Sequence, residues 1–269
     1  MTTPESVYTN GHHPSVLASH RWRTAVNSAA YLLPHLHSGA TLLDVGCGPG
    51  TITADIARLV APARVTAIEI SEEALDLGRD EAARQGVTTI DFAVGDVHDL
   101  QFADDTFVVV HAHQVLQHVP DPGQALREMR RVCRPGGIVA ARDSDYATFT
   151  WWPPLPELDE WRDLYTSLAR SNGGEPDAGR RLLSWAQQAG FEEVVATSST
   201  WCFATPEDRL WWGSMWAARI TQSGIAKQAV QSGATDAAGL ARIADGWRRW
   251  AAADDGWLSI LHGEILATA

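Results

Sequence analysis

The chain has 269 residues, 45% of them hydrophobic and 20% charged, with a formal net charge of −12. This length allows one full hydrophobic core with an elaboration, and the acidic balance without any Lys/Arg run disfavours a nucleic-acid partner. No stretch reaches the ~18–20 apolar residues of a membrane span, and residues 1–20 lack the apolar segment of a secretion signal. The three cysteines imply no disulfide framework, so we expect a cytoplasmic protein.

The first half of the chain alternates apolar runs with helical patterns. Residues 1–14 carry turn signals, and the apolar positions of residues 16–36 predict one helix. From Thr41 onward strand and helix patterns alternate, which predicts a parallel sheet with helices on both faces. The expected strands are residues 41–46, 64–70, 90–95, 106–112 and 137–142, and the expected helices are residues 50–60, 72–85 and 121–133.

The second half is less regular and rich in tryptophan. Eight of the twelve tryptophans fall between Trp151 and Trp216. Residues 151–156 predict a loop because prolines interrupt them, and about 50 mostly helical residues separate the last two expected strands, more than compact connections prefer. We expect this insertion to form a lid or a pocket wall. The expected helices are residues 156–172, 178–189, 206–220, 226–231 and 235–252, and the expected strands are residues 191–203 and 256–267.

A glycine loop follows the first expected strand. Residues 44–50 read Asp-Val-Gly-Cys-Gly-Pro-Gly, with glycines at alternate positions. Glycine tolerates positive φ and lets the backbone approach a ligand, and the helix that follows offers free N–H groups. A dinucleotide loop would place the third glycine one residue later, so this spacing disfavours a nicotinamide dehydrogenase.

Polar residues mark the carboxyl ends of the other expected strands, where ligands of such sheets bind. Glu69 closes the second strand, and its carboxylate can accept both ribose hydroxyls of an adenosine. Asp96 follows the third strand, Gln114 the fourth and Asp143 the fifth. We therefore expect these side chains to line one site together with the glycine loop.

These motifs, in this order, resemble class I S-adenosylmethionine-dependent methyltransferases. The segments LLDVGCGPG, QVLQHVPDP and CRPGG are most similar to the branch of quinone-ring C-methyltransferases and small-molecule methyltransferases. The resemblance implies a Rossmann-like, seven-stranded, mostly parallel α/β sheet whose last two strands form an antiparallel edge hairpin. It also implies S-adenosyl-L-methionine as cofactor, held by Asp44, Gly46, Cys47, Gly48, Gly50, Glu69, Ile70, Asp96, Val97 and Gln114, with Arg23 reaching its carboxylate.

We expect the chain to comprise three segments. Residues 1–40 form an N-terminal helical segment that covers the cofactor, and residues 41–145 form the cofactor-binding core. Residues 146–269 complete the same domain and add the aromatic, helical elaboration on the substrate side. The oligomeric state stays open between a monomer and a homodimer.

Candidate catalytic residues follow the fourth and fifth strands. His118 is the first choice for a general base because an ordinary histidine titrates near neutral pH, and Asp143 is the second. The spacing of His111, His113 and His118 matches no closed zinc site, so we expect no metal. The substrate-side candidates are Tyr8, His113, Tyr146, Trp151 and Trp152. The rings of Trp151 and Trp152 suit a flat or hydrophobic acceptor, whereas Tyr146 is a second choice as a base or as an anchor for a polar substrate group.

The sequence therefore predicts an enzyme that transfers a methyl group to a small, hydrophobic or aromatic acceptor by in-line displacement. One alternative is a quinone-ring C-methyltransferase, and another is a regulatory protein that binds the cofactor without catalysis. The Ala- and Arg-rich, Lys-poor composition hints at a bacterial source.

Overall fold

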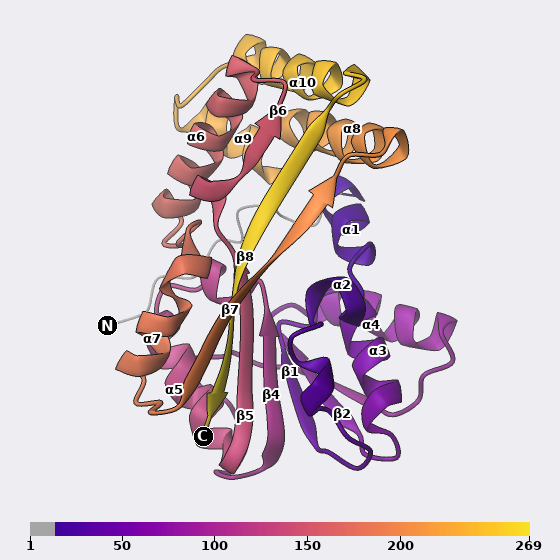
Figure 1. Cartoon of the computed structure of the whole chain (residues 1–269), viewed down its shortest axis with the longest axis vertical. Helices are drawn as coiled ribbons and strands as arrows, with labels where there is room; N and C mark the ends of the chain where they lie inside the picture. Colours follow the sequence, from indigo (N-terminus) through magenta and orange to yellow (C-terminus); the bar gives the residue numbers. More distant parts are fainter. Residues whose placement is uncertain (1–13) are drawn as a thin grey trace. The chain divides into compact units, whose positions relative to one another are not determined.

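The computed structural model describes residues 14–269 (Figure 1). Internal contacts divide these residues into two compact units that interleave along the sequence. The sheet unit comprises His20–Ser144, Ala178–Ser199 and His262–Ala269. The tryptophan unit comprises residues 14–19, Asp145–Asp177 and Thr200–Leu261.

The strands follow the order β3-β2-β1-β4-β5-β8-β6, and β7 pairs with β8 off this path. β1 to β5 pair in parallel, whereas β8 runs antiparallel to β5 and β6. The mostly parallel sheet is confirmed, but the expected count of seven strands is wrong, because the short β6 adds an eighth. The bounds are β1 Leu42–Val45, β2 Val65–Glu69, β3 Ile90–Val94, β4 Phe107–His113, β5 Cys133–Ser144, β6 Thr150–Trp152, β7 Val194–Phe203 and β8 Trp257–Thr268.

Helices cover both faces of the parallel strands in the sheet unit, because successive strand residues point to opposite sides. Leu43 and Val45 pack in one cluster with Met129 of α5 (Pro122–Val132) and with residues of α7 (Leu182–Gln188). Leu42, which precedes Leu43 on β1, packs in the other cluster with Ile56 of α3 (Thr51–Val60). Residues of α2 (Ala25–Ser28) and α4 (Glu72–Arg84) join that second cluster.

The single helix expected over residues 16–36 is wrong. The segment forms α1 (Pro14–Arg21), α2 and the 3-10 turn η1 (Leu33–His35). Thr24 is extended, with φ −131° and ψ 165°, and its side chain accepts a hydrogen bond from the backbone N–H of Asn27. This N-cap starts the new helix α2. Pro34, whose ring fixes φ, lies in the later turn η1.

The tryptophan unit contains α6 (Pro156–Ser171), α8 (Pro206–Gln222), α9 (Gly224–Gln231) and α10 (Ala237–Ala252), and its interior is aromatic. Figure 1 shows α8 and α10 lying side by side. Gly213 permits this contact, since a Cβ there would lie 2.7 Å from Cβ of Ala251. The helical insertion between β7 and β8 is thus confirmed. The loop expected from residue 151 is wrong at its start, because Trp151 and Trp152 pair with β8 as part of β6.

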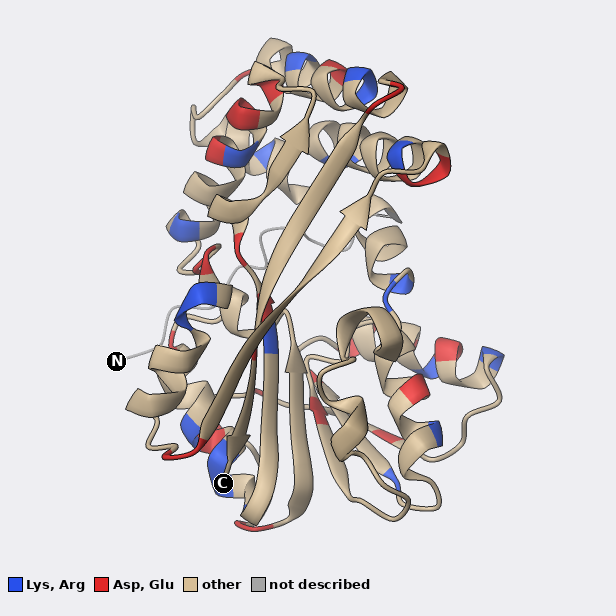
Figure 2. Cartoon of the chain, viewed as in Figure 1, with Lys and Arg blue, Asp and Glu red and all other residues tan. Residues whose placement is uncertain are grey.

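Charge is mixed on the described residues. Figure 2 shows basic residues interspersed with acidic ones on the helices of each unit. Among residues 14–269, no helix is both long and apolar enough to cross a membrane.

Candidate active site

The glycine loop between β1 and α3 adopts the backbone that only glycine accepts easily. Gly46, Gly48 and Gly50 have φ of 66°, 52° and 74°. A Cβ at Gly46 would lie 2.4 Å from Cγ2 of Val115, and one at Gly50 would lie 3.1 Å from Cα of Gly78. A Cβ at Gly48 would meet nothing within 4 Å, so this part of the loop faces open space.

Glu69, at the end of β2, is held beside the loop. Its Oε1 accepts the backbone N–H of Gly48 at 3.2 Å, and its Oε2 accepts that of Ile70 at 2.9 Å. The backbone N–H of Gly46 also bonds the carbonyl of Ile68 at 2.9 Å. The structure therefore brings the ends of β1 and β2 together as expected, and the Ile70 side chain is 64% exposed beside them.

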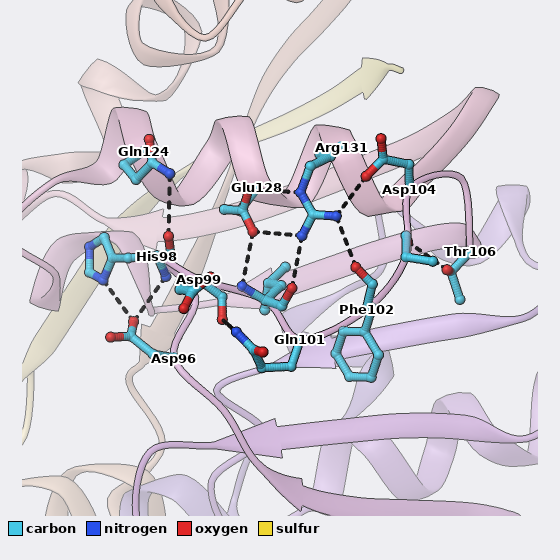
Figure 3. A network of polar contacts seen from close by, with 12 residues as sticks. Asp96, His98, Asp99, Gln101, Phe102, Asp104, Thr106, Gln124, Glu128 and Arg131 are labelled. Atoms are coloured by element: carbon cyan, nitrogen blue, oxygen red, sulfur yellow. Dashed lines mark hydrogen bonds and ion pairs between the residues drawn. The ribbon is translucent and has the colours of Figure 1, made fainter.

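Asp96 follows β3 on a loop tied to α5 (Figure 3). Its Oδ1 accepts the backbone N–H of His98 at 2.9 Å and lies 2.8 Å from the His98 ring. Arg131 donates to the carbonyls of Leu100 and Phe102, both at 2.8 Å. Its side chain also pairs with Glu128, which lowers the pKa of that carboxyl. The Asp96 carboxylate stays half exposed, whereas Val97 packs in the core beneath the loop.

The Asp44 carboxylate, at the start of the glycine loop, is held by two buried hydrogen bonds. Its Oδ1 lies 2.8 Å from Nδ1 of His111 and its Oδ2 accepts the Thr53 hydroxyl at 2.5 Å, so both oxygens are engaged inside the protein. The Cys47 thiol has a pKa well above its ordinary value because it is buried near carboxylates. It is therefore a protonated thiol near neutral pH, as suits a residue that contributes its backbone.

Gln114 links Arg23 to the last strand. Its backbone is left-handed, with φ 54°, which is uncommon outside glycine. Its Oε1 accepts Nη2 of Arg23 at 2.6 Å, and its Nε2 lies 2.9 Å from Nε2 of His262 on β8. Arg23 therefore reaches the strand ends, although the helix expected around it is broken.

His118 lies in the 3-10 turn η2 (Leu116–His118). Its Nε2 is 3.0 Å from Nε2 of Gln117, whose Oε1 already accepts the Ser144 backbone N–H and hydroxyl. The amide NH₂ of Gln117 therefore donates to the imidazole. Burial, followed by the charge of Arg23, lowers the pKa of His118 to about 4. Both observations oppose the expected role of His118 as the base, because its lone pair is occupied and weakly basic.

Asp143, the second catalytic candidate, lies near the end of β5 with no exposed surface. Its Oδ1 accepts the backbone N–H of Gln117 at 3.1 Å. Burial raises the pKa of this carboxyl to about 7, against the opposing effects of backbone N–H bonds and of Arg142 and Arg23. Asp143 therefore titrates in the range that suits proton transfer near neutrality.

His113 is a neutral packing neighbour of the site. It is buried, its ring lies 6.4 Å from that of His262, and burial keeps its pKa well below the ordinary value. In residues 14–269 no three His, Cys, Asp or Glu side chains are arranged to hold a metal ion. The substrate role of His113 stays a prediction.

Of the remaining substrate candidates, Tyr146, Trp151 and Trp152 belong to the tryptophan unit. Tyr8 lies outside the described residues. Tyr146 stacks between Phe149 and Tyr165 within the tryptophan unit, with ring centroids 4.3 and 4.2 Å away. Trp151 packs edge-on to Trp161, and the 53% exposed Trp152 donates its indole N–H to Asp255 at 2.7 Å. Their role toward a substrate stays a prediction.

Three polar residues of the site are absent from the sequence-based candidates. Gln117 and His262 orient or contact the predicted residues, and Thr53 holds Asp44. Gln117 stands inside the segment QVLQHVPDP, so its position was available from the motif. His262 lies in an alternating strand, where nothing in the local pattern distinguishes a site residue from a packing residue.

Comparisons with known proteins agree with this geometry. A family model described as a methyltransferase domain matches residues 36–197. An uncharacterized methyltransferase of Schizosaccharomyces pombe is 34% identical over 98% of this chain and 97% of its own length. The demethylmenaquinone methyltransferase of Staphylococcus aureus is 32% identical over 58% of this chain and 62% of its own length. The structure of Haemonchus contortus phosphoethanolamine N-methyltransferase 2 in complex with S-adenosyl-L-methionine has a TM-score of 0.58 at 15% identity, over 99% of this chain and 61% of that one.

The family model covers more than half of the chain, and the fungal relative matches nearly all of it. A bacterial source therefore stays a prediction. The structural neighbour supports the fold of this chain. The chain thus belongs to the methyltransferase domain family and is an S-adenosylmethionine-dependent methyltransferase.

Proposed function

We propose that the chain methylates a small, hydrophobic or aromatic molecule, with the cofactor held at the carboxyl ends of β1 to β4. The observation that carries this assignment is the contact between the glycine loop and Glu69, in which Glu69 accepts the Gly48 backbone N–H. The contact places a carboxylate beside an open backbone turn at adjacent strand ends.

The residues present fit S-adenosyl-L-methionine. Gly48 faces open space, Glu69 provides a carboxylate for ribose hydroxyls, and Asp96 keeps its side chain half exposed for an amino group. Arg23 supplies a guanidinium near Gln114, which suits a carboxylate. When bound, this cofactor supplies a methyl group already activated by a sulfonium sulfur.

The protein's task is then to align the acceptor and exclude water. The left-handed Gln114 and the buried Asp143 belong to the ends of the neighbouring strands β4 and β5, so rigid elements hold both. The proposal of a flat or apolar acceptor comes from the aromatic pair Trp151 and Trp152, which follows β5 in the sequence. The Staphylococcus aureus relative keeps a quinone ring among the acceptors to test, although the match covers 58% of this chain.

The experiment is a methyl-transfer assay by mass spectrometry with phenols, amines and quinols as acceptors. We compare wild type with Glu69→Ala and with Glu192→Ala, an exposed matched control. Glu69→Ala is expected to raise KM for S-adenosylmethionine at least tenfold, about 1.4 kcal/mol, without lowering Tm, while Glu192→Ala matches wild type. An unchanged KM in Glu69→Ala would contradict the proposed cofactor site.

A further inference from the structure

The carboxyl of Asp143 has one anchored oxygen and one oxygen that the protein leaves unsatisfied. Oδ1 accepts the Gln117 backbone N–H at 3.1 Å, whereas Oδ2 is buried and has no hydrogen-bond partner among the described residues. A buried polar atom without a partner is unfavourable, and such atoms call for a functional explanation. The anchored oxygen fixes the carboxyl, so Oδ2 is oriented and keeps its full capacity to accept a hydrogen bond.

The imidazoles of His118 and His262 are not alternative proton acceptors, because each already accepts a hydrogen bond from a glutamine. Gln117 donates its NH₂ to Nε2 of His118 because its oxygen is occupied by Ser144. Gln114 likewise donates to Nε2 of His262 because its oxygen accepts Arg23. In both pairs Nε2 acts as an acceptor, so its lone pair is already engaged and does not take a proton from a substrate.

Burial and two neighbouring arginines together set the pKa of Asp143. Arg142 beside it on β5 and Arg23 from the segment before α2 lower its pKa, and burial raises it further than they lower it. Burial raises the pKa of the Tyr31 phenol, and the charge of Asp143 raises it further by a smaller amount. Tyr31 is therefore protonated near neutral pH. Asp143 is therefore the group of this cluster that changes protonation near neutrality.

We propose that Asp143 accepts a proton from the acceptor during methyl transfer, and that the methylated atom is the hydroxyl oxygen of a phenol or an enol. This inference rests on the proposed function. The O–H bond breaks and its proton passes to Oδ2 of Asp143. The freed oxygen pair forms the new O–CH₃ bond, and the electron pair of the broken C–S bond stays on sulfur.

The acidity of the acceptor's hydroxyl decides which class of acceptor Asp143 can deprotonate. Proton transfer from a phenol to a carboxyl with a pKa of about 7 is unfavourable by a factor of about 10³. An aliphatic alcohol, with an acidity near that of water, would make the same step unfavourable by a factor of about 10⁹. An amine needs no base before attack. Asp143 is therefore matched to a phenolic or enolic hydroxyl.

The test uses the full chain with 4-methylphenol, 4-methylaniline and 4-nitrophenol as probes. Transfer to 4-methylphenol is expected to rise through a midpoint near pH 7 in wild type. Asp143→Asn is expected to lose at least a hundredfold and the pH dependence with it, and Asp143→Glu to lose less. Transfer to 4-nitrophenol, which is mostly ionised at mildly alkaline pH, is expected to fall less than tenfold in Asp143→Asn. The matched control is Asp91→Asn, which removes an exposed carboxyl of β3 and leaves these rates unchanged.

Calorimetry supplies a readout independent of turnover. We titrate 4-methylphenol into wild type and Asp143→Asn, each saturated with S-adenosylhomocysteine, and expect at least tenfold weaker binding in the variant. Equal binding in both, no binding of the phenol to either, or a wild-type rate without a midpoint near pH 7 would overturn the role of Asp143. Methylation of 4-methylaniline without 4-methylphenol would do the same. Failure of S-adenosylhomocysteine itself to bind would instead refute the proposed cofactor site.

Discussion

The two units fill their interiors with different chemistry. In the sheet unit, buried polar side chains at the strand ends hold one another, as in Asp44 with His111 and in Arg142 with Glu264. In the tryptophan unit, Trp161, Trp216 and Trp247 fill the interior, with ring centroids 4.6 to 5.9 Å apart. Polar networks orient groups for chemistry, whereas aromatic packing supplies stability. Substitutions in the first unit should therefore change function, and substitutions in the second should first change stability.

The largest expected effect on stability is that of Trp161→Ala. Trp161 has no exposed surface and packs against Trp216 and Trp247. Truncation of such a side chain costs about 3–5 kcal/mol. Urea unfolding followed by circular dichroism measures it, with the 40% exposed Trp257→Ala as control, at about 1 kcal/mol or less. Loss of S-adenosylhomocysteine affinity without loss of stability would break the comparison.

Asp143→Asn should change how stability depends on pH. The folded-state pKa of about 7 lies above the ordinary 3.8, so the native state holds this proton more tightly than the unfolded chain. Wild-type stability therefore falls as pH rises from about 4 to 7, by up to about 4 kcal/mol from this group. Asparagine removes that loss, and Tm measured across this range should fall less in the variant. Parallel Tm profiles for the two proteins would contradict the burial argument.

Gly46→Ala tests the close approach of the loop to Val115. Gly46 and Gly86 share a φ of 66°, but a methyl group at Gly46 would lie within 3 Å of Val115, whereas one at Gly86 would meet nothing within 4 Å. Gly86→Ala should cost about 1 kcal/mol from backbone strain alone, and Gly46→Ala about 2 kcal/mol or more, with weaker cofactor binding. Urea midpoints and calorimetry measure both. Equal losses in the two variants would remove the steric argument.

The smallest effect is expected at the surface of the tryptophan unit. Asp255→Ala removes the acceptor of the Trp152 indole N–H, which is 2.7 Å away. Since Trp152 is 53% exposed, water replaces that partner and the loss stays below about 1 kcal/mol. A larger drop in the urea midpoint would show that this edge contributes more stability than its exposure suggests.

Much of the sheet unit could be predicted from sequence because its signals are local. Buried parallel strands read as apolar runs, and the loop after β1 needs glycine at positions 46 and 50 to avoid Val115 and Gly78. The helix over residues 16–36 failed because Thr24 caps a new helix, a choice that apolar spacing does not encode. β6 was missed because its three residues pair with a strand more than 100 positions away.

Side-chain roles at the site were less predictable than positions. An ordinary histidine titrates near neutral pH, but the orientation of Gln117 and the burial of the ring decide the protonation of His118. The contact between Gln114 and His262 joins residues 148 positions apart. Such pairs depend on the register of β8 against β5, which the sequence of neither strand reveals alone.

The central claim, that the sheet unit holds the cofactor, is tested most directly by calorimetric titration of S-adenosylhomocysteine and NAD into wild type and Glu69→Ala. We predict one S-adenosylhomocysteine site per chain in wild type, at least tenfold weaker binding in Glu69→Ala, and no heat from NAD. Binding of NAD, or S-adenosylhomocysteine affinity that Glu69→Ala leaves unchanged, would contradict it.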